Sequence, residues 1–257
     1  MEFLKISIED YVAVITIERP PANALSSGMI LELSEAFDEI RGNEQVRSVL
    51  IHGEGRFFSA GADIKEFTSV ESGAVFSELA RRGQRVFEKI ETFEKPVIAA
   101  IHGAALGGGL ELAMACHIRL VTEQAKLGLP ELQLGIIPGF AGTQRLPRYV
   151  GTAKAAEMLF TSEPINGAEA VRLGLANHAY SEEDLLPKAK EMAAKIAKKS
   201  PLALKLAVEL LSFSKPDSYY KGVEQEAGNF GIAFDSADGK EGIAAFIEKR
   251  EPVFKGQ

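Results

Sequence analysis

The feature that most constrains this chain is a run of glycines between a buried strand and an apolar helix. Residues 95–103 (KPVIAAIHG) are typical of a buried strand, and Gly107, Gly108 and Gly109 follow shortly after it. Residues 110–116 (LELAMAC) predict a short helix. Backbone N–H groups at such a junction can point outward at the positive end of the helix dipole. The junction therefore suits a phosphate group or a developing oxyanion.

The residues around these glycines argue against a nucleotide phosphate as the anion. A dinucleotide-binding fingerprint would need a glycine where Leu112 stands, and no Gly-Lys-Ser/Thr ends a P-loop here. An oxyanion hole is the better interpretation, and such a hole normally needs two donors. Residues 57–63 (FFSAGAD) form the other small-residue loop after a buried strand, so we expect the second donor in that loop.

Two glutamates lie in apolar segments that also contain glycine. Glu111 lies among leucines, alanines and a methionine, and Glu131 follows Pro130 in LGLPELQLGIIPGFAG (127–142). A carboxylate in such surroundings needs a partner or acquires a raised pKa. A structural ion pair or a solvent-facing position on a short helix would account for Glu111 alone, and a helix cap would account for Glu131 alone. Together they would serve as a general acid and base, although spacing alone does not show whether they face each other.

Strand and helix patterns alternate through about residue 180, which predicts an α/β fold. Alternating apolar residues on either side of Glu9-Asp10 predict a hairpin, and Ser26 or Ser27 would cap a helix that ends near Arg41. Four helices follow Glu182 without a convincing strand, and they would pack on their own domain or form subunit contacts. Further elements are predicted as strands over 46–53, 118–123 and 125–129 and as a helix over 71–93.

Composition limits the setting and the partners of the chain. Of its 257 residues, 46% are hydrophobic and 25% charged, as in soluble globular proteins, and the net charge of −7 argues against general affinity for nucleic acid or anionic membranes. The one cysteine, Cys116, cannot form an internal disulfide. No secretory signal pattern and no apolar stretch near the roughly 20 residues of a bilayer span are found, which predicts a cytoplasmic location.

Three central segments together resemble the enoyl-CoA hydratase/isomerase (crotonase) family. They are FFSAGADIKEF (57–67), KPVIAAIHGAALGGGLELAMAC (95–116) and LGLPELQLGIIPGFAGTQRLPRYVG (127–151). ANALSSGMILEL (22–33) and KEGIAAFIEKREPVF (240–254) match as well, so the resemblance covers essentially the whole chain. It implies a core of repeated ββα turns over residues 1–195 and a helical trimerisation region over 196–257. It also implies a homo-oligomer, commonly a hexamer built as a dimer of trimers.

The resemblance assigns roles to the motifs. The N–H groups of Ala62 and Gly108 would hold the thioester oxygen of an acyl-CoA substrate and stabilise its enolate. Glu111 would deprotonate a water molecule for attack at C3, and Glu131 would supply a proton to C2. Coenzyme A is then part of the substrate, and no metal or other cofactor is implied. Residues expected to bind the substrate or CoA are Ala60, Gly61, Asp63, Ile64, Lys65, Gly107, Pro138 and Gly139, with Phe230, Phe246 and Lys249 reaching the CoA of a neighbouring subunit.

The presence of both glutamates favours a short- to medium-chain enoyl-CoA hydratase of fatty-acid or amino-acid breakdown. Family isomerases typically keep only the residue that matches Glu131. Two alternatives stay open: a sibling reaction, such as isomerisation or hydration of a branched or aromatic acyl-CoA, and a catalytically silent protein that binds acyl-CoA or RNA. The chain departs from the family at His117, where aspartate is common, and at Ala141, where glycine is common. Neither residue belongs to the donors or the glutamates.

Overall fold

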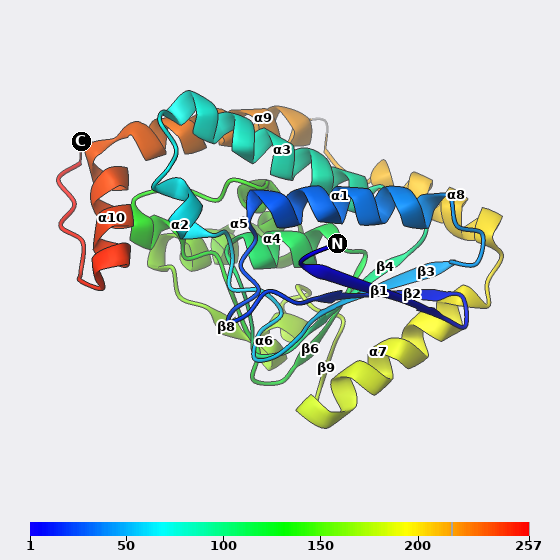
Figure 1. The fold of residues 1–257 in the computed structure, drawn as a ribbon. Coiled ribbons are helices and arrows are strands. Elements are labelled where there is room, and N and C mark those ends of the chain that lie inside the picture. The colour runs from blue at the N-terminus through cyan, green and yellow to red at the C-terminus, as the bar shows by residue number, and fades with distance from the viewer. Residues whose placement is uncertain (217, 257) are drawn as a thin grey trace.

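A six-stranded sheet forms the centre of the molecule (Figure 1). The computed structural model describes residues 1–216 and 218–256. Only the first pair of strands is antiparallel, and the remaining neighbours are parallel. The spatial order along the sheet is β1 (Leu4–Glu9), β2 (Val12–Ile17), β3 (Ser48–Gly53), β4 (Val97–Ile101), β6 (Ile118–Thr122) and β9 (His178–Tyr180).

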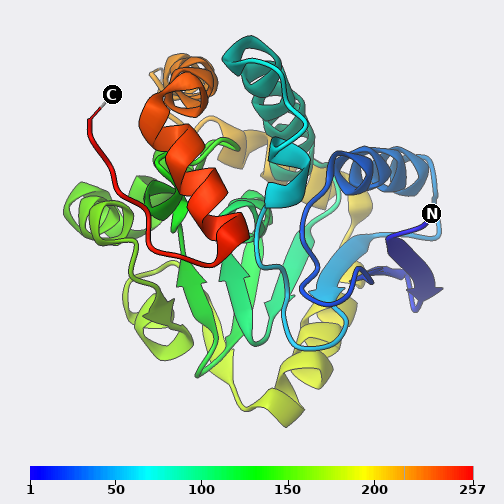
Figure 2. The ribbon, with the colours of Figure 1, turned by 60° about the vertical axis from the view of Figure 1, so that its left-hand side comes forward.

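The inner strands β2, β3, β4 and β6 are largely buried on both faces because helices cover both. Ile15 and Ile51 point into the larger core with α1 (Ser27–Arg41) and α3 (Gly73–Glu91), whereas Val14 and Leu50 point into a second core beneath the sheet. This second core is completed by α7 (Glu182–Ala197), which lies below the sheet in Figures 1 and 2. Successive strand residues point to opposite faces, so the run of apolar residues predicts this two-sided burial.

A second, three-stranded sheet positions the pocket described below. It consists of β5 (Ala104–Leu106), β7 (Lys126–Gly128) and β8 (Ile165–Asn166), with β5 and β7 parallel and Leu106 opposite Gly128. Each of these two strands leads into a short helix: α4 (Gly108–Ala115) and the 3₁₀ helix η1 (Glu131–Leu134). Parallel strands end at the same edge of a sheet. The two helices, and the glutamates in them, therefore begin side by side.

Helices surround the two sheets. α1, α3 and α9 form a layer above the large sheet, and α10 closes the end of the molecule beside α2 and η1 (Figures 1 and 2). In the described residues, no helix is both long enough and apolar enough to cross a membrane. The remaining bounds are α2 (Ile64–Phe67), α5 (Gly142–Thr161, interrupted at Gly151), α6 (Gly167–Arg172), α8 (Pro201–Ser212), α9 (Tyr219–Asp235) and α10 (Ala237–Glu248).

The mixed α/β fold with C-terminal helices confirms the class predicted from the sequence. The hairpin turns at Asp10 and Tyr11, and the Ser26 hydroxyl caps α1 by accepting a hydrogen bond from the Met29 N–H. Helix α4 begins two residues before the predicted Leu110, because Gly108 and Gly109 already belong to its first turn. Four helices follow Glu182, as predicted. The division at residues 195 and 196 stays a prediction, and α7 itself continues to Ala197.

Candidate active site

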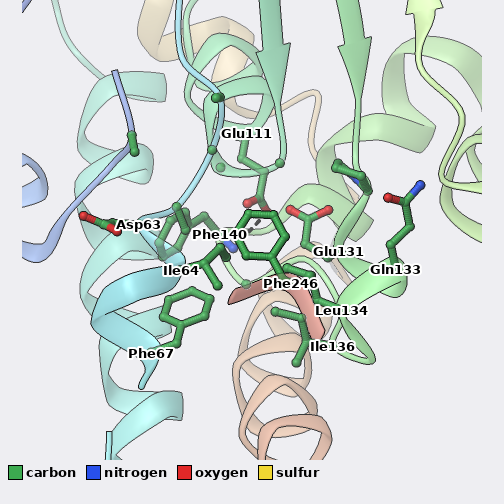
Figure 3. A pocket seen from close by; sticks show the side chains of 18 of the residues that line it. Asp63, Ile64, Phe67, Glu111, Glu131, Gln133, Leu134, Ile136, Phe140 and Phe246 are labelled. Atoms are coloured by element: carbon green, nitrogen blue, oxygen red, sulfur yellow. Dashed lines mark hydrogen bonds between the residues drawn. The ribbon is translucent and has the colours of Figure 1, made fainter. Parts of the chain in front are cut away.

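The two glycine loops and both glutamates line one pocket of about 310 Å³ (Figure 3). The loop after β3 supplies one wall, α4 and η1 supply the floor, and Phe246 of α10 lies at the opposite side. Its wall is largely apolar, with the two glutamates among few polar groups. Of the residues proposed from the sequence, the pocket is lined by Ala60, Gly61, Ala62, Asp63, Ile64, Lys65, Gly107, Gly108, Glu111, Glu131, Gly139, Phe230 and Phe246.

The N–H of Ala62 is kept available by the pairing on either side of it. The N–H of Leu25 donates to the Gly61 carbonyl at 2.7 Å, and the N–H of Asp63 donates to the Leu25 carbonyl at 3.0 Å. In an extended segment, successive N–H groups point to opposite sides. The Ala62 N–H therefore points away from Leu25, and no acceptor within the described residues pairs with it.

The N–H of Gly108 is left free by its place in the first turn of α4, where a helix has no internal acceptor for it. The preceding Gly107 has φ +51°, a left-handed conformation that favours glycine. A Cβ at that position would also lie 2.9 Å from Glu131 Oε1. Gly107 thus lets the chain turn sharply into the helix and leaves room for the second carboxylate. Ala62 and Gly108 both line the pocket, and neither N–H has an acceptor among the described residues, so these two donors would suit an oxyanion hole.

Glu111 is buried, with 1% of its surface exposed, and only backbone groups hold it. Its Oε1 accepts hydrogen bonds from the N–H groups of Phe140 at 2.8 Å and Gly142 at 2.7 Å. Burial raises its pKa well above the ordinary value, the nearby charges of Glu131 and Glu226 raise it further, and the two N–H donors oppose the rise. The sequence predicts either a partner or a raised pKa for Glu111, and in the structure Glu111 has both.

Glu131 stands beside Glu111, and Figure 3 shows both carboxyl groups directed into the pocket. The residue as a whole is half-buried, but its Oε2 is shielded from water and has no hydrogen-bond partner in the described chain. Burial raises its pKa to about 8, with a further rise from the charge of Glu226, while its own backbone N–H acts in the opposite direction. A carboxyl group in this state is a proton donor near neutral pH.

A third buried carboxyl group, Glu226 of α9, belongs to the same cluster and was missed by the sequence interpretation. Burial raises its pKa to about 7, while hydrogen bonds from the side chain and backbone of Thr143 oppose the rise. One signal could have found it. Glu226 lies four residues before Phe230 and eight before Phe234, on the apolar stripe of its helix, where an unpaired carboxylate is not expected.

Several proposed residues lie elsewhere or have another role. Pro138 and Lys249 are not among the lining residues of this pocket. Asp63 lines it, but its carboxylate accepts from the Lys65 N–H at the start of α2 and pairs with Arg19 at 2.5 Å. The contact of Phe230 and Phe246 with the CoA of a neighbouring subunit stays a prediction. Both line the pocket of their own chain, because α10 packs on α9 and η1.

The two departures from the family pattern have local structural roles. His117 Nδ1 accepts a hydrogen bond from the Val97 N–H at 2.9 Å, and burial lowers the pKa of His117 to about 4, so its ring is neutral. Ala141 has φ +69° and ψ +26°, a left-handed conformation in which glycine is favoured. The backbone around Ala141 therefore keeps the shape of a glycine turn although the residue is alanine.

Comparison with known proteins shows which family the chain is similar to. The enoyl-CoA hydratase/isomerase family matches residues 7–257. A probable enoyl-CoA hydratase of Bacillus subtilis is 60% identical over the full length of both chains, and a crotonyl-CoA hydratase of Syntrophomonas wolfei is 44% identical, covering 96% of this chain and 95% of its own. The crystal structure of an enoyl-CoA hydratase from Bacillus anthracis superposes with a TM-score of 0.79 and 37% identity, covering 99% of this chain and 100% of the other.

The chain therefore belongs to the enoyl-CoA hydratase/isomerase family. Relatives that are 60% and 44% identical over nearly the whole of both chains are named hydratases, so this chain is an enzyme of the hydratase kind. Such an enzyme implies an acyl-CoA substrate.

Proposed function

We propose that this enzyme adds water across the 2-trans double bond of an enoyl-CoA to form a 3-hydroxyacyl-CoA. One observation supports this most strongly. Two buried carboxyl groups without a cationic partner among the described residues face the same pocket as two free backbone N–H donors. Hydration needs one group to take a proton, another to give one, and donors for the enolate oxygen.

The surroundings of the two glutamates assign their roles. Like charges near each other oppose double ionisation, so the pair holds one proton near neutral pH. Two N–H donors at Oε1 favour the ionised form of Glu111, whereas Oε2 of Glu131 has no donor and favours its protonated form. Glu111 therefore acts as the base and Glu131 as the acid.

The reaction balances with these roles. The N–H groups of Ala62 and Gly108 bind the thioester oxygen and stabilise the negative charge that develops there. Glu111 takes a proton from water as the hydroxyl oxygen bonds to C3, and the C2–C3 double bond shifts its electrons toward the thioester. Glu131 then delivers its proton to C2. Proton transfer between the two carboxyl groups through the next water molecule restores the starting state.

Substrate anchoring and assembly complete the proposal. The exposed Lys65, at the rim of the pocket, would contact a phosphate of CoA, with Ala60 and Phe246 beside the pantetheine arm. Helix α8 exposes Leu202, Leu206 and Leu210, which supports a trimer contact on that face within a hexamer.

Loss of the conjugated-thioester absorbance of crotonyl-CoA tests the reaction. We expect rapid loss with the wild type, and a decrease in kcat of about 10²–10⁴-fold in Glu111→Gln and in Glu131→Gln, because each removes one proton-transfer group. Both variants should still bind acyl-CoA. The exposed Glu123, changed to Gln, is the matched control and should behave as the wild type.

Other outcomes would redirect the proposal. Binding of crotonyl-CoA without hydration by the wild type would favour a sibling reaction or a bulkier substrate. Normal turnover in either glutamine variant would remove that residue from its assigned role. Absence of both binding and turnover would favour the silent acyl-CoA- or RNA-binding scaffold.

A further inference from the structure

One short backbone segment is shared between two buried carboxyl groups. The N–H groups of Phe140 and Gly142 donate to Oε1 of Glu111, at 2.8 and 2.7 Å. The intervening N–H of Ala141 donates to Oε1 of Glu226, and the N–H of Thr143 donates to Oε2 of Glu226 at 2.9 Å. Four consecutive N–H groups thus alternate between a glutamate of the pocket and a glutamate of α9.

Two side chains also donate to Glu226. The Thr143 hydroxyl donates to its Oε2, and Gln84 Nε2 of α3 lies 3.5 Å from its Oε1. Glu226 is 3% exposed and makes no salt bridge with any residue the structure describes. A buried carboxylate without a cation must be stabilised by hydrogen bonds. Here the backbone N–H groups of Ala141 and Thr143 provide two of the four, and the side chains of Thr143 and Gln84 provide the other two.

The segment needs such support. Ala141 has the left-handed backbone conformation that a residue with a side chain rarely adopts, and such a conformation persists only where neighbouring contacts impose it. Without Glu226, two buried N–H groups would lose their acceptor, and the turn could relax. Any such relaxation would move the N–H groups of Phe140 and Gly142, which orient Glu111.

We propose that Glu226 is a positioning residue for the hydration reaction, which holds residues 140–143 so that Glu111 is aimed at the attacking water. This inference rests on the hydratase activity proposed above. Glu226 does not line the pocket, so it acts through the backbone and its charge rather than by touching the substrate.

Glu226→Gln tests the inference, because glutamine keeps the shape but places an NH₂ group against one pair of donors. We expect kcat for crotonyl-CoA to fall by roughly 10- to 100-fold, as for a misplaced catalytic group, with KM changed less than about threefold. Glu224→Gln is the matched control: it lies on the same helix, is exposed and pairs with Arg81, and should retain wild-type kinetics.

The pH profile separates positioning from a general loss of stability. The negative charge of Glu226 raises the pKa of both Glu111 and Glu131, so its removal should move both limbs of the kcat profile to lower pH. A variant that is merely less stable would keep the wild-type limbs. The polar and titratable groups that act on Glu226 are Gln84 from α3, Glu111 from α4, Glu131 from η1 and Thr143 and Arg145 from α5.

A second variant covers the case in which Glu226→Gln does not fold. Thr143→Val removes only the hydroxyl donor to Glu226. It should lower kcat about two- to fivefold, which is less than the fall expected for Glu226→Gln, and leave KM unchanged. The inference is overturned if Glu226→Gln keeps kcat within twofold and an unshifted profile, or if it is unfolded and Thr143→Val is unchanged. An inactive wild type would instead contradict the proposed function.

Discussion

Two clusters that contain carboxyl groups with little or partial exposure differ in what surrounds those groups. In the first, the ionic cluster, Glu91 pairs with Arg145 at 2.9 Å, Arg148 at 2.7 Å and Lys215 at 3.3 Å. In the second, the carboxyl cluster, no carboxyl group forms a salt bridge with a cationic side chain of the residues that the structure describes. Its members are Glu111, Glu131 and Glu226.

The difference shows how burial can serve either stability or chemistry. Burial by itself raises the pKa of Glu91, but its three cations outweigh this and lower the pKa to about 2. Burial raises the pKa of Glu131 to about 8, and no cation offsets the rise. A carboxyl group that is always ionised can hold a structure together but cannot exchange protons near pH 7. The chain thus uses one residue type for two purposes, according to its neighbours.

The largest effect is expected from breaking the ionic cluster. Glu91→Gln should lower the free energy of unfolding by about 3–5 kcal/mol, because it leaves the buried Arg145 without its main partner. Denaturant unfolding at pH 7 measures this. The kcat per folded molecule should stay within about threefold, as for a structural contact. A large loss of kcat at unchanged stability would mean that the two clusters do not differ in the way described.

Crowding the carboxyl cluster should affect activity more than stability. In Gly107→Ala the new Cβ would lie 2.9 Å from Glu131 Oε1, in a backbone conformation unfavourable for alanine. We expect kcat for crotonyl-CoA to fall roughly 10- to 100-fold as Glu131 is displaced. Steady-state kinetics measure this, with Gly55→Ala as control, since Gly55 also has a positive φ but no atom near its Cβ position. Equal effects of both variants would attribute the loss to backbone strain alone.

The two clusters should have opposite effects on stability as pH changes. Glu91, with its pKa lowered to about 2, stabilises the fold above the ordinary value of 4.5, and this contribution is lost as pH falls toward 2. Glu131, with its pKa raised to about 8, stabilises the fold below 4.5, and this contribution is lost as pH rises through 8. Glu131→Gln should therefore be more stable than the wild type at pH 9 by roughly 1–2 kcal/mol. Denaturation at pH 6 and pH 9 measures the difference, and equal stabilities at pH 9 would contradict the raised pKa.

The smallest effect is expected at Ala141. Glycine adopts its left-handed conformation without strain but loses more entropy on folding, so Ala141→Gly should change stability by less than about 1 kcal/mol. The hydrogen bonds of this segment come from the backbone, so kcat should stay within twofold. Thermal unfolding and crotonyl-CoA kinetics measure both. A loss of more than tenfold in kcat would show that the Ala141 side chain itself shapes the turn.

Much of the site was predictable because its signals are local. The triple glycine, the free N–H groups at a strand-to-helix junction and the apolar surroundings of Glu111 and Glu131 all lie within short stretches of sequence. The hairpin and the cap at Ser26 follow from local rules as well. These features depend on neighbours within a few residues, so the sequence by itself determined them.

Only the tertiary structure decided which carboxyl groups meet cations and which do not. Glu91 is paired with residues 54, 57 and 124 positions further along the chain, and Glu226 reaches the turn that holds Glu111 from 85 positions away. The own-chain placement of Phe246 depends likewise on the packing of α10 against η1. Desolvation and charge pairing are properties of spatial neighbours, and those neighbours are set when distant segments pack. Residue types and short spacings therefore identified the candidate groups, whereas their pKa values and their supports arose from the fold.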